Sequence, residues 1–416
     1  MDTTRREFLK TGVTLLGAGA LLPAVVQRAL LTLQQEPARG APVDDGRILV
    51  VVQMAGGNDG LNTVVPFTDG RYYDARPAIS VPPKDALLLN DTTGLHPSLR
   101  EMQELWNQGV LAIVEGVGYP NQNYSHFVSM DIWQTGDPQR KLNDGWLGRY
   151  CEKYQGQHEA PFLGLAIGRS LPTSLQTPSV AIPAVDSLNT YRFQDDASAP
   201  ALSAARHLSL LNLYRQGNPS SFYGALLDKT IQAAEKSTVI LQKAHAQYKP
   251  AVQYPSSSLA SALQLVAEAI ASNTGVKICH VSIGGFDTHA DQIPDQSRQL
   301  GYLSASLYAF YSDLKAQGLD SKVVVMTWSE FGRRVKGNGS QGTDHGSAAP
   351  LFFIGTPVKG GIYGQRPGLA DLDNGNLRYA VDFRSAYASA LETWLGVTSQ
   401  DVLGGSFELL PLFNKG

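Results

Sequence analysis

Apolar and polar positions fall in blocks along this chain, and the first clear block is an apolar run from Ile48 to Met54. The run reads ILVVVQM and leads into AGGNDGLN, where two glycines precede Asn58 and Asp59. A short β-branched run bounded by glycine is typical of a strand buried on both faces. Open α/β sheets bind ligands beyond the carboxyl ends of such strands, so Asp59 stands where a functional carboxylate is expected. Asn-Asp-Gly also fits an ordinary turn, and both interpretations stay open here.

A helix and further strands follow in alternation. Leu99, Met102, Leu105 and Trp106 share one helical face, and VLAIVEGVG at 110–118 reads as the next strand. This order of strand, helix and strand is typical of a doubly wound, mostly parallel α/β sheet flanked by helices. Further along, the pattern predicts helices over 258–275, 295–317 and 382–396, and strands over 276–283, 322–328 and 350–355.

One part of the chain departs from this alternation. Over residues 155–255 the content of Pro, Ser, Gln and Asn rises, and one helical stretch runs from about Ala225 to Tyr248. We interpret this part as an insertion or cap inside a single α/β domain that covers 42–416.

Paired arginines stand near the start of the chain, ahead of TGVTLLGAGALLPAVV. We expect residues 1–41 to be a twin-arginine signal peptide and linker, with the twin-arginine translocase as export partner and a periplasmic or extracellular destination. Pro23 breaks the apolar stretch, which is short for a span, so no stable membrane span is expected. The signal motif is matched at Thr4, Arg5, Arg6, Phe8, Leu9 and Lys10.

Composition narrows the classes of partner. The 416 residues are 43% apolar and 17% charged with a net charge of −3, which fits a globular protein and gives no sign of a nucleic-acid partner. Cys151 and Cys279 are the two cysteines, so no disulfide framework is expected.

Carboxylate and imidazole side chains follow or precede the predicted strands. The stretches that carry them are GGFDTHADQ after one strand, SEFGRR after the next, and GTDHGSAAP before another. Loops at one edge of a sheet bring distant residues together, and this mixture of ligands suits Zn²⁺, Mn²⁺ or Fe. A pair of such ions can clamp a phosphate or sulfate ester. The candidate ligands are Asp59, Asp287, His289, Glu330, Asp344 and His345.

A nucleophile candidate lies in NQNYSHFVSMDIWQTG. Ser125 begins a predicted helix, where the positive helix end favours an oxyanion or alkoxide, although a plain N-cap role fits it as well. His126 is the second candidate in this loop, as ligand or acid. Arg333 is a candidate for orienting an oxyanion, with a surface ion pair as the alternative.

These motifs carry a resemblance. GGNDGLN, SHF with DIWQTG, GGFDTH, SEFGR and GTDHG in this order resemble the domain-of-unknown-function 1501 family, over Ile48 to Leu412. That family is similar to the alkaline phosphatase and sulfatase superfamily, which implies an alkaline-phosphatase-like fold with a two-metal site. The resemblance implies that Ser125 is the nucleophile and that metal ligands stand at Asp59, Asp287, Glu330 and His345.

The sequence also departs from the superfamily pattern. His289 is two residues too close to Asp287, and Phe331 stands where the superfamily places a metal-binding histidine. Neither cysteine begins the Cys-x-Pro-x-Arg motif that sulfatases convert to formylglycine, so a sulfatase of that type is not expected.

Two hypotheses follow. The first is an exported hydrolase of phosphate or related small-molecule esters that depends on a divalent metal, with Zn, Mn, Mg, Ca and Fe all open. The second is a secreted binding or assembly protein that keeps the fold without turnover, because fold does not guarantee function. A nicotinamide or flavin oxidoreductase would need Gly-x-Gly-x-x-Gly after the first strand, and Gly56-Gly57-Asn58-Asp59-Gly60 has the wrong spacing.

Overall fold

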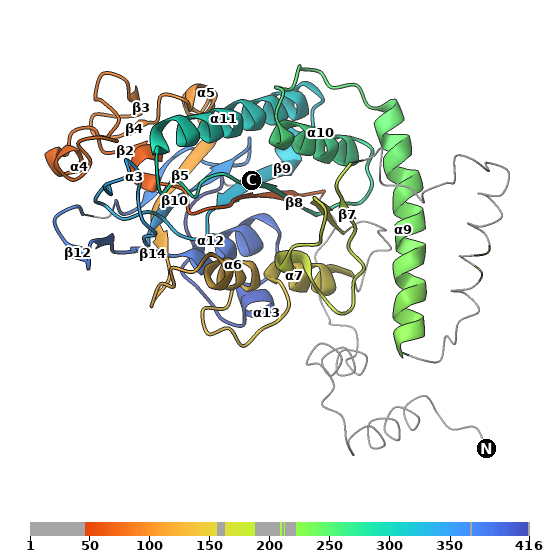
Figure 1. Ribbon diagram of the computed structural model, residues 1–416. Helices are drawn as coiled ribbons and strands as arrows, with labels where there is room; N and C mark the ends of the chain where they lie inside the picture. Colours follow the sequence, from red (N-terminus) through yellow and green to blue (C-terminus); the bar gives the residue numbers. More distant parts are fainter. Residues whose placement is uncertain are drawn as a thin grey trace, which may run out of the picture. The chain divides into compact units, whose positions relative to one another are not determined.

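A nine-stranded sheet forms the centre of the protein (Figure 1). The computed structural model describes residues 46–155, 163–187, 209, 212, 222–366 and 368–414. The strand order is β11-β5-β10-β9-β1-β8-β6-β7, and β14 pairs with β5. The strands of this sheet are β1 (Ile48–Met54), β5 (Leu111–Gly118), β6 (Gly164–Ile167), β7 (Ala184–Val185), β8 (Ile278–Ile283), β9 (Val323–Trp328), β10 (Ala349–Ile354), β11 (Gly361–Gly364) and β14 (Val381–Asp382).

The sheet is mostly parallel, as predicted. Strand β1 pairs in parallel with both β8 and β9, so that Val50 lies opposite Cys279 and Val325. Strand β10 runs antiparallel to its neighbours β5 and β9. Its first residues therefore lie at the edge where the other core strands end.

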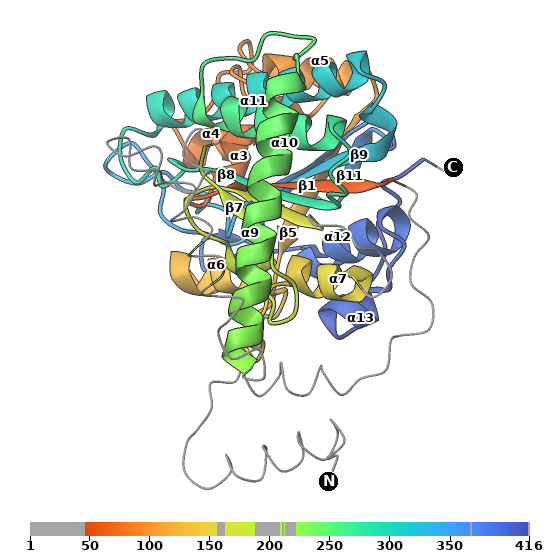
Figure 2. The same ribbon diagram turned by 90° about the vertical axis from the view of Figure 1, so that its right-hand side faces the viewer.

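Helices cover both faces of the sheet, which confirms the doubly wound α/β class (Figures 1 and 2). One face carries α5 (Arg100–Asn107), α10 (Ser258–Ala271) and α11 (Gln292–Ala316), and the other carries α6 (His126–Thr135), α7 (Trp146–Gln155) and α12 (Phe383–Ser389). Alternate residues of β1 serve two cores: Val50 and Val52 pack under α10 and α11, while Leu49 and Val51 face α7 and α12.

Shorter elements complete the described chain. Helix α11 begins three residues before the predicted start, and the last predicted helix continues from α12 into a π-turn, η3 (Ala390–Trp394). The remaining elements are α3 (Gly60–Thr63), α4 (Gly70–Ala75), α13 (Ser399–Leu403), η1 (Thr173–Leu175), η2 (Asp320–Lys322), β2 (Val64–Val65), β3 (Leu87–Leu88), β4 (Gly94–Leu95), β12 (Leu372–Asp373) and β13 (Asn376–Leu377).

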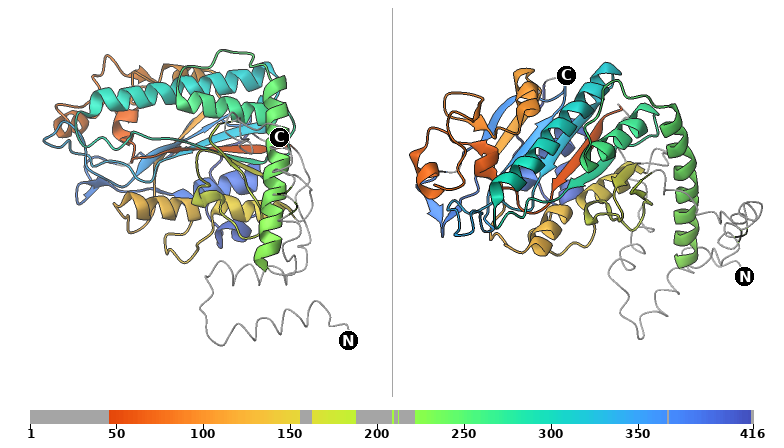
Figure 3. Two further views of the ribbon diagram at one scale, coloured as in Figure 1. Left: turned by 45° about the vertical axis from the view of Figure 1, so that its right-hand side comes forward. Right: turned by 45° about the horizontal axis from the view of Figure 1, so that its top comes forward.

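The predicted insertion at 155–255 is described in part. Strand β6 lies within it and pairs with β8, so this portion belongs to the central sheet. Helix α9 (Phe222–Gln247) matches the predicted helical stretch and packs against α10 (Figures 2 and 3). The predicted signal at 1–41 lies outside the described residues. Among the helices that the structure describes, none is both long and apolar enough to span a membrane.

Candidate metal centre

Two imidazoles and a carboxylate meet at the carboxyl edge of the sheet. His126 begins α6 after the loop that follows β5, Asp287 follows β8, and His345 precedes β10. The antiparallel direction of β10 is what brings His345 to this edge. One ligand atom from each of the three side chains lies within 4.8 Å of the other two.

The glycine pair at the end of β1 allows close packing between β1 and the loops at this edge of the sheet. Gly56 has φ 122° and Gly57 has φ 70°, which L side chains rarely adopt. A Cβ on Gly56 would lie 2.4 Å from the backbone nitrogen of Asp287, and one on Gly57 would lie 2.3 Å from the ring of Phe331. The two glycines therefore let β1 pack directly against the loops that carry the cluster.

In both histidines a hydrogen-bond acceptor lies next to Nδ1 and fixes the orientation of the ring. The Nδ1 atom of His126 lies 2.7 Å from Oε1 of Glu330, and Nδ1 of His345 lies 2.7 Å from the backbone oxygen of Tyr124. A carbonyl oxygen only accepts, so Nδ1 of His345 carries the hydrogen and its Nε2 keeps the lone pair. The Glu330 carboxylate favours the same tautomer at His126. This arrangement of a histidine backed by an acceptor is the usual one at metal-binding histidines.

The two Nε2 atoms face the same carboxylate. Nε2 of His345 lies 3.2 Å from Oδ1 of Asp287, and Nε2 of His126 lies 3.4 Å from Oδ2. Nε2 of His126 is buried and has no hydrogen-bond partner in the described structure. The cluster thus directs two neutral nitrogen donors and one carboxylate toward a common point, a donor set that suits a divalent transition metal.

Charge and burial favour an ionised Asp287 and a neutral His345, but they favour the protonated form of His126. Burial opposes ionisation of Asp287, but the Arg333 guanidinium outweighs it through its hydrogen bond and its charge and lowers the pKa of this carboxyl to about 2. Burial also lowers the pKa of His345, which favours the neutral imidazole. The hydrogen bond to Glu330 raises the pKa of His126. A bound cation would compete with that proton at Nε2.

His289 lies at the exposed side of the cluster. Its Nε2 is 2.9 Å from Nε2 of His345 and 3.1 Å from Oδ1 of Asp287. Its Nδ1 faces Oδ1 of Asp344 at 3.6 Å, which is too long for a hydrogen bond. The predicted ligand His289 is therefore in reach of the site, whereas Asp344 stands behind it and also accepts from Asn338.

Glu330 does not face the cluster as a predicted ligand would. Its side chain is fully buried, and Oε1 accepts from the backbone N–H of Gly56 as well as from His126. The prediction of direct ligation is corrected: Glu330 orients the imidazole of His126.

Arg333 is likewise turned into the protein. Its guanidinium is fully buried, and the donation to Oδ1 of Asp287 at 2.7 Å holds that carboxylate in place. The predicted contact with a substrate oxyanion does not fit, because the guanidinium is buried and each of its three nitrogens donates to a backbone oxygen. These oxygens belong to Gly56, Gly57, Phe286 and Thr343.

Asp59 lies in a separate buried network. Its Oδ2 pairs with Nη1 of Arg76 at 2.5 Å and accepts from Nε2 of Gln292, while Oδ1 caps α3 through the N–H of Leu61. The positive group next to Asp59 is thus a guanidinium. The structure does not bring Asp59 to the cluster, and the prediction of a metal ligand here is corrected.

Ser125 and Phe331 flank the imidazoles. Ser125 is the N-cap residue of α6 but its side chain makes no capping hydrogen bond, and the residue is exposed. The ring of Phe331 is buried, with its centroid 4.9 Å from that of His126 and 4.6 Å from that of His345. Phe331 therefore packs an apolar ring against both imidazoles.

The sequence of this protein matches the model of one protein family over most of its length. The model described as protein of unknown function (DUF1501) matches residues 89–391, well over half of the chain. The chain belongs to the DUF1501 family. This confirms the resemblance drawn from the motifs. No curated protein matches this DUF1501 chain.

Several solved structures are similar to this DUF1501 protein at low identity. The lipoteichoic acid synthase LtaP from Listeria monocytogenes is 10% identical with a TM-score of 0.36, and the match covers 87% of this chain and 76% of LtaP. A protein in the alkaline phosphatase superfamily from Vibrio parahaemolyticus is 8% identical, TM-score 0.40, with 88% and 70% covered. The PsFucS1 sulfatase from Pseudoalteromonas sp. is 12% identical, TM-score 0.38, with 93% and 74% covered.

Several residues of the DUF1501 site gave no signal in the sequence. Tyr124 contributes a backbone oxygen, which no motif reveals, and Arg76 lies 17 positions from its partner Asp59. Thr288 and Thr343 stand inside the histidine motifs, as the Thr of DTH and of TDH, and this repeated threonine was the available clue. Gln292 follows the first of these motifs at the start of α11.

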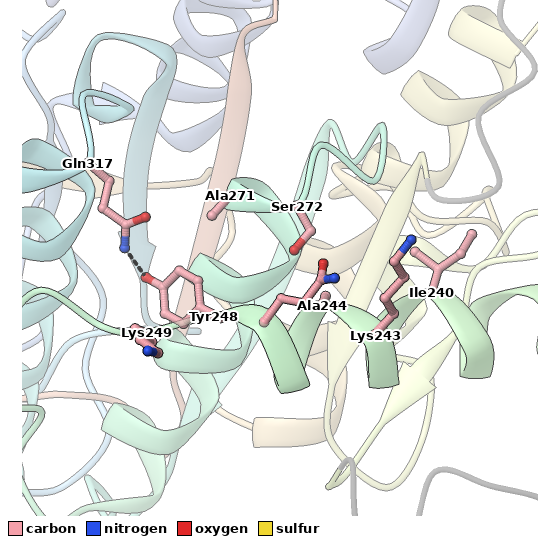
Figure 4. A pocket seen from close by; sticks show the side chains of 9 residues that line it. Ile240, Lys243, Ala244, Tyr248, Lys249, Ala271, Ser272 and Gln317 are labelled. Atoms are coloured by element: carbon pink, nitrogen blue, oxygen red, sulfur yellow. Dashed lines mark hydrogen bonds between the residues drawn. The ribbon is translucent and has the colours of Figure 1, made fainter.

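A pocket lies at the opposite edge of the sheet, where α9, α10 and α11 end (Figure 4). Its volume is about 460 Å³, and the cluster residues are not part of its wall. Tyr248 and Gln317 are hydrogen-bonded at one side of it. The pocket is therefore distinct from the candidate metal centre of this DUF1501 protein.

Proposed function

We propose that this protein is a hydrolase of phosphate or related esters that uses one divalent metal ion held by His126, Asp287 and His345. The observation that carries the proposal is the orientation of the two imidazoles, each backed at Nδ1 and each presenting Nε2 toward Asp287. Three protein ligands with a further open position are typical of catalytic zinc sites, whereas four closed ligands are typical of structural ones. His289 stands beside the cluster as a fourth, exchangeable ligand.

The residues around the cluster have separable roles. Glu330 and the Tyr124 backbone oxygen hold the imidazoles, and Arg333 holds Asp287. A bound divalent ion supplies charge neutralisation at the ester oxygens and lowers the pKa of an oxygen nucleophile.

Ser125 is the proposed nucleophile. Ser125 stands in the chain between Tyr124, whose backbone oxygen faces Nδ1 of His345, and His126 of the cluster, so its backbone lies beside the proposed ion. The N-terminus of α6 adds a positive partial charge at the Ser125 hydroxyl.

The cluster holds one metal ion in this proposal, not a pair. Two of the residues that the resemblance assigns as metal ligands have other partners, because Asp59 is paired with Arg76 and Glu330 with His126. Phe331, which is apolar, stands where the superfamily places a metal-binding histidine. Zn²⁺, Mn²⁺ and Fe suit the imidazole and carboxylate set best. Export through the twin-arginine translocase is proposed from the signal motif.

The features that argue against a second ion also favour a second candidate function. A secreted binding or assembly protein would keep one metal ion and the fold without turnover. Phe331 and the Arg76–Asp59 pair support this candidate because they remove the second ion from the site.

Turnover by metal-loaded protein tests the proposal. Wild type, Ser125→Ala and Ser321→Ala are loaded with Zn²⁺ or Mn²⁺ and assayed on nitrophenyl phosphate, phosphate diester and sulfate. Ser321 is an exposed serine at the opposite edge, so its variant is the control. We expect Ser125→Ala alone to lose turnover while it still binds metal. Unchanged turnover in Ser125→Ala rejects the nucleophile, and metal-loaded wild type without turnover favours the binding protein.

A further inference from the structure

Gln292 is a fully buried amide that connects two separate arms of the metal centre. Its Oε1 accepts from the hydroxyl of Thr288 at 3.2 Å and from that of Thr343 at 2.6 Å. Thr288 precedes His289, and Thr343 stands two residues before His345. One oxygen atom therefore joins the arm that follows β8 to the arm that precedes β10.

The orientation of this amide is fixed by the acceptors that face its nitrogen. Nε2 of Gln292 donates to Oδ2 of Asp59 at 2.5 Å and to Oε1 of Gln296 at 3.1 Å. The same Oδ2 of Asp59 accepts from the buried guanidinium of Arg76, so it faces donors on both sides. The amide nitrogen must face Asp59, so the amide oxygen must face the two threonine hydroxyls.

The two arms touch at the point where Gln292 joins them. The backbone N–H of Thr343 donates to the backbone oxygen of Thr288 at 3.2 Å. Arg333, which holds Asp287, also donates to the backbone oxygen of Thr343 at 2.8 Å. A shift of either threonine therefore moves a histidine of the cluster relative to Asp287.

We propose that Gln292 is a positioning residue that sets the spacing between the Asp287–His289 arm and the His345 arm and thereby sets metal affinity. Asp59 and Arg76 form its anchor, which accounts for the carboxylate at the end of β1. The inference rests on the proposed metal site.

Gln296 provides a matched control. It lies one turn later on α11 and is also buried, with 1% of its surface exposed. Its Nε2 donates to the backbone oxygen of Asp59 at 3.0 Å, and its other contacts are to Asn58, Thr63 and Gln292. It makes no hydrogen bond to Thr288 or Thr343 in the described structure, so its loss removes a buried amide without freeing the arms.

The experiment compares Gln292→Met with Gln296→Met by Co²⁺ titration, using the visible absorption spectrum of the Co²⁺ protein and the Kd, together with urea unfolding of the metal-free proteins. We expect Gln292→Met to bind Co²⁺ about tenfold more weakly with an altered spectrum, as for outer-shell residues elsewhere. Gln296→Met is expected to lose similar stability but keep the wild-type spectrum and Kd. Thr343→Val, which removes one hydroxyl and leaves Asp59 untouched, repeats the test if Gln292→Met does not fold.

The outcomes separate the two levels of the proposal. Wild type that binds no Co²⁺ overturns the metal site and this inference together. Wild type that binds Co²⁺ while Gln292→Met and Thr343→Val match it in Kd and spectrum overturns the inference alone. Equal weakening in Gln292→Met and Gln296→Met also overturns it, because it shows a general effect of buried amides.

Discussion

Replacement of Arg76 by methionine tests the claim that a guanidinium, rather than a metal ion, neutralises Asp59. Arg76 and Asp59 are both buried, with 0% and 1% of their side-chain surfaces exposed, and their nearest atoms are 2.5 Å apart. Arg76 also donates to Asn62 and to two backbone oxygens. Arg76→Met leaves a buried carboxylate without its cation, which costs about 3–5 kcal/mol. Native proteins have about 5–15 kcal/mol of stability in total, so this loss is readily measured.

Urea unfolding of metal-free protein measures the effect, with Arg71→Met as the matched control. Arg71 forms an ion pair with Asp69 at 3.5 Å but is 63% exposed, and a surface pair of this kind contributes at most about 1 kcal/mol. The double variant Arg76→Met, Asp59→Asn is expected to regain part of the loss because the unpaired charge is gone. The reasoning is refuted if Arg76→Met costs no more than Arg71→Met, or if Asp59→Asn alone abolishes metal binding.

Three further predictions concern the interior and the centre. Burial lowers the pKa of His280 to about 4 from its usual 6.5, so between these values the unfolded chain binds more protons than the folded one. His280 should contribute a fall in stability of about 3 kcal/mol as pH drops from about 6.5 to 4. In unfolding curves at several pH values, His280→Leu should remove this contribution and leave that of His96, whose pKa burial also lowers to about 4. Glu330→Gln weakens the support of His126 and should raise the Co²⁺ Kd about tenfold; an unchanged Kd would show that Glu330 does not orient the ligand. Phe331→His should leave the metal stoichiometry at one, because Arg76 still neutralises Asp59, and a second bound ion would contradict that assignment.

The alternation of apolar and polar positions along the chain was sufficient to predict a central sheet with helices on both faces. Strand β1 could be predicted because a β-branched apolar run that ends in a glycine pair has a distinctive composition, and its residues do face two separate cores. The direction of β10 could not be predicted, because the apolar pattern of PLFFIG fits a parallel strand and an antiparallel strand equally well. That direction decides whether His345 reaches the edge where Asp287 lies.

The structure brings some of the predicted site residues together and gives others different contacts. His126, Asp287, His289 and His345 do come together, since each stands at the end of a core strand or in the loop beyond it. Asp59, Glu330 and Arg333 also stand at strand ends, but their partners decide what they do. A carboxylate that ligates a metal and one that orients a histidine look the same in a sequence, because the difference lies in contacts between distant segments.

The bound metal content of the purified protein tests the central claim most directly. Elemental mass spectrometry of wild type, Asp287→Ala, His345→Ala and Asp344→Ala gives the number of ions per chain. Asp344 is the matched control because it is an acidic neighbour that stands behind His289. We expect one ion in wild type and in Asp344→Ala, and none in the other two variants. No ion in wild type, or one that persists in both Asp287→Ala and His345→Ala, would contradict the metal centre.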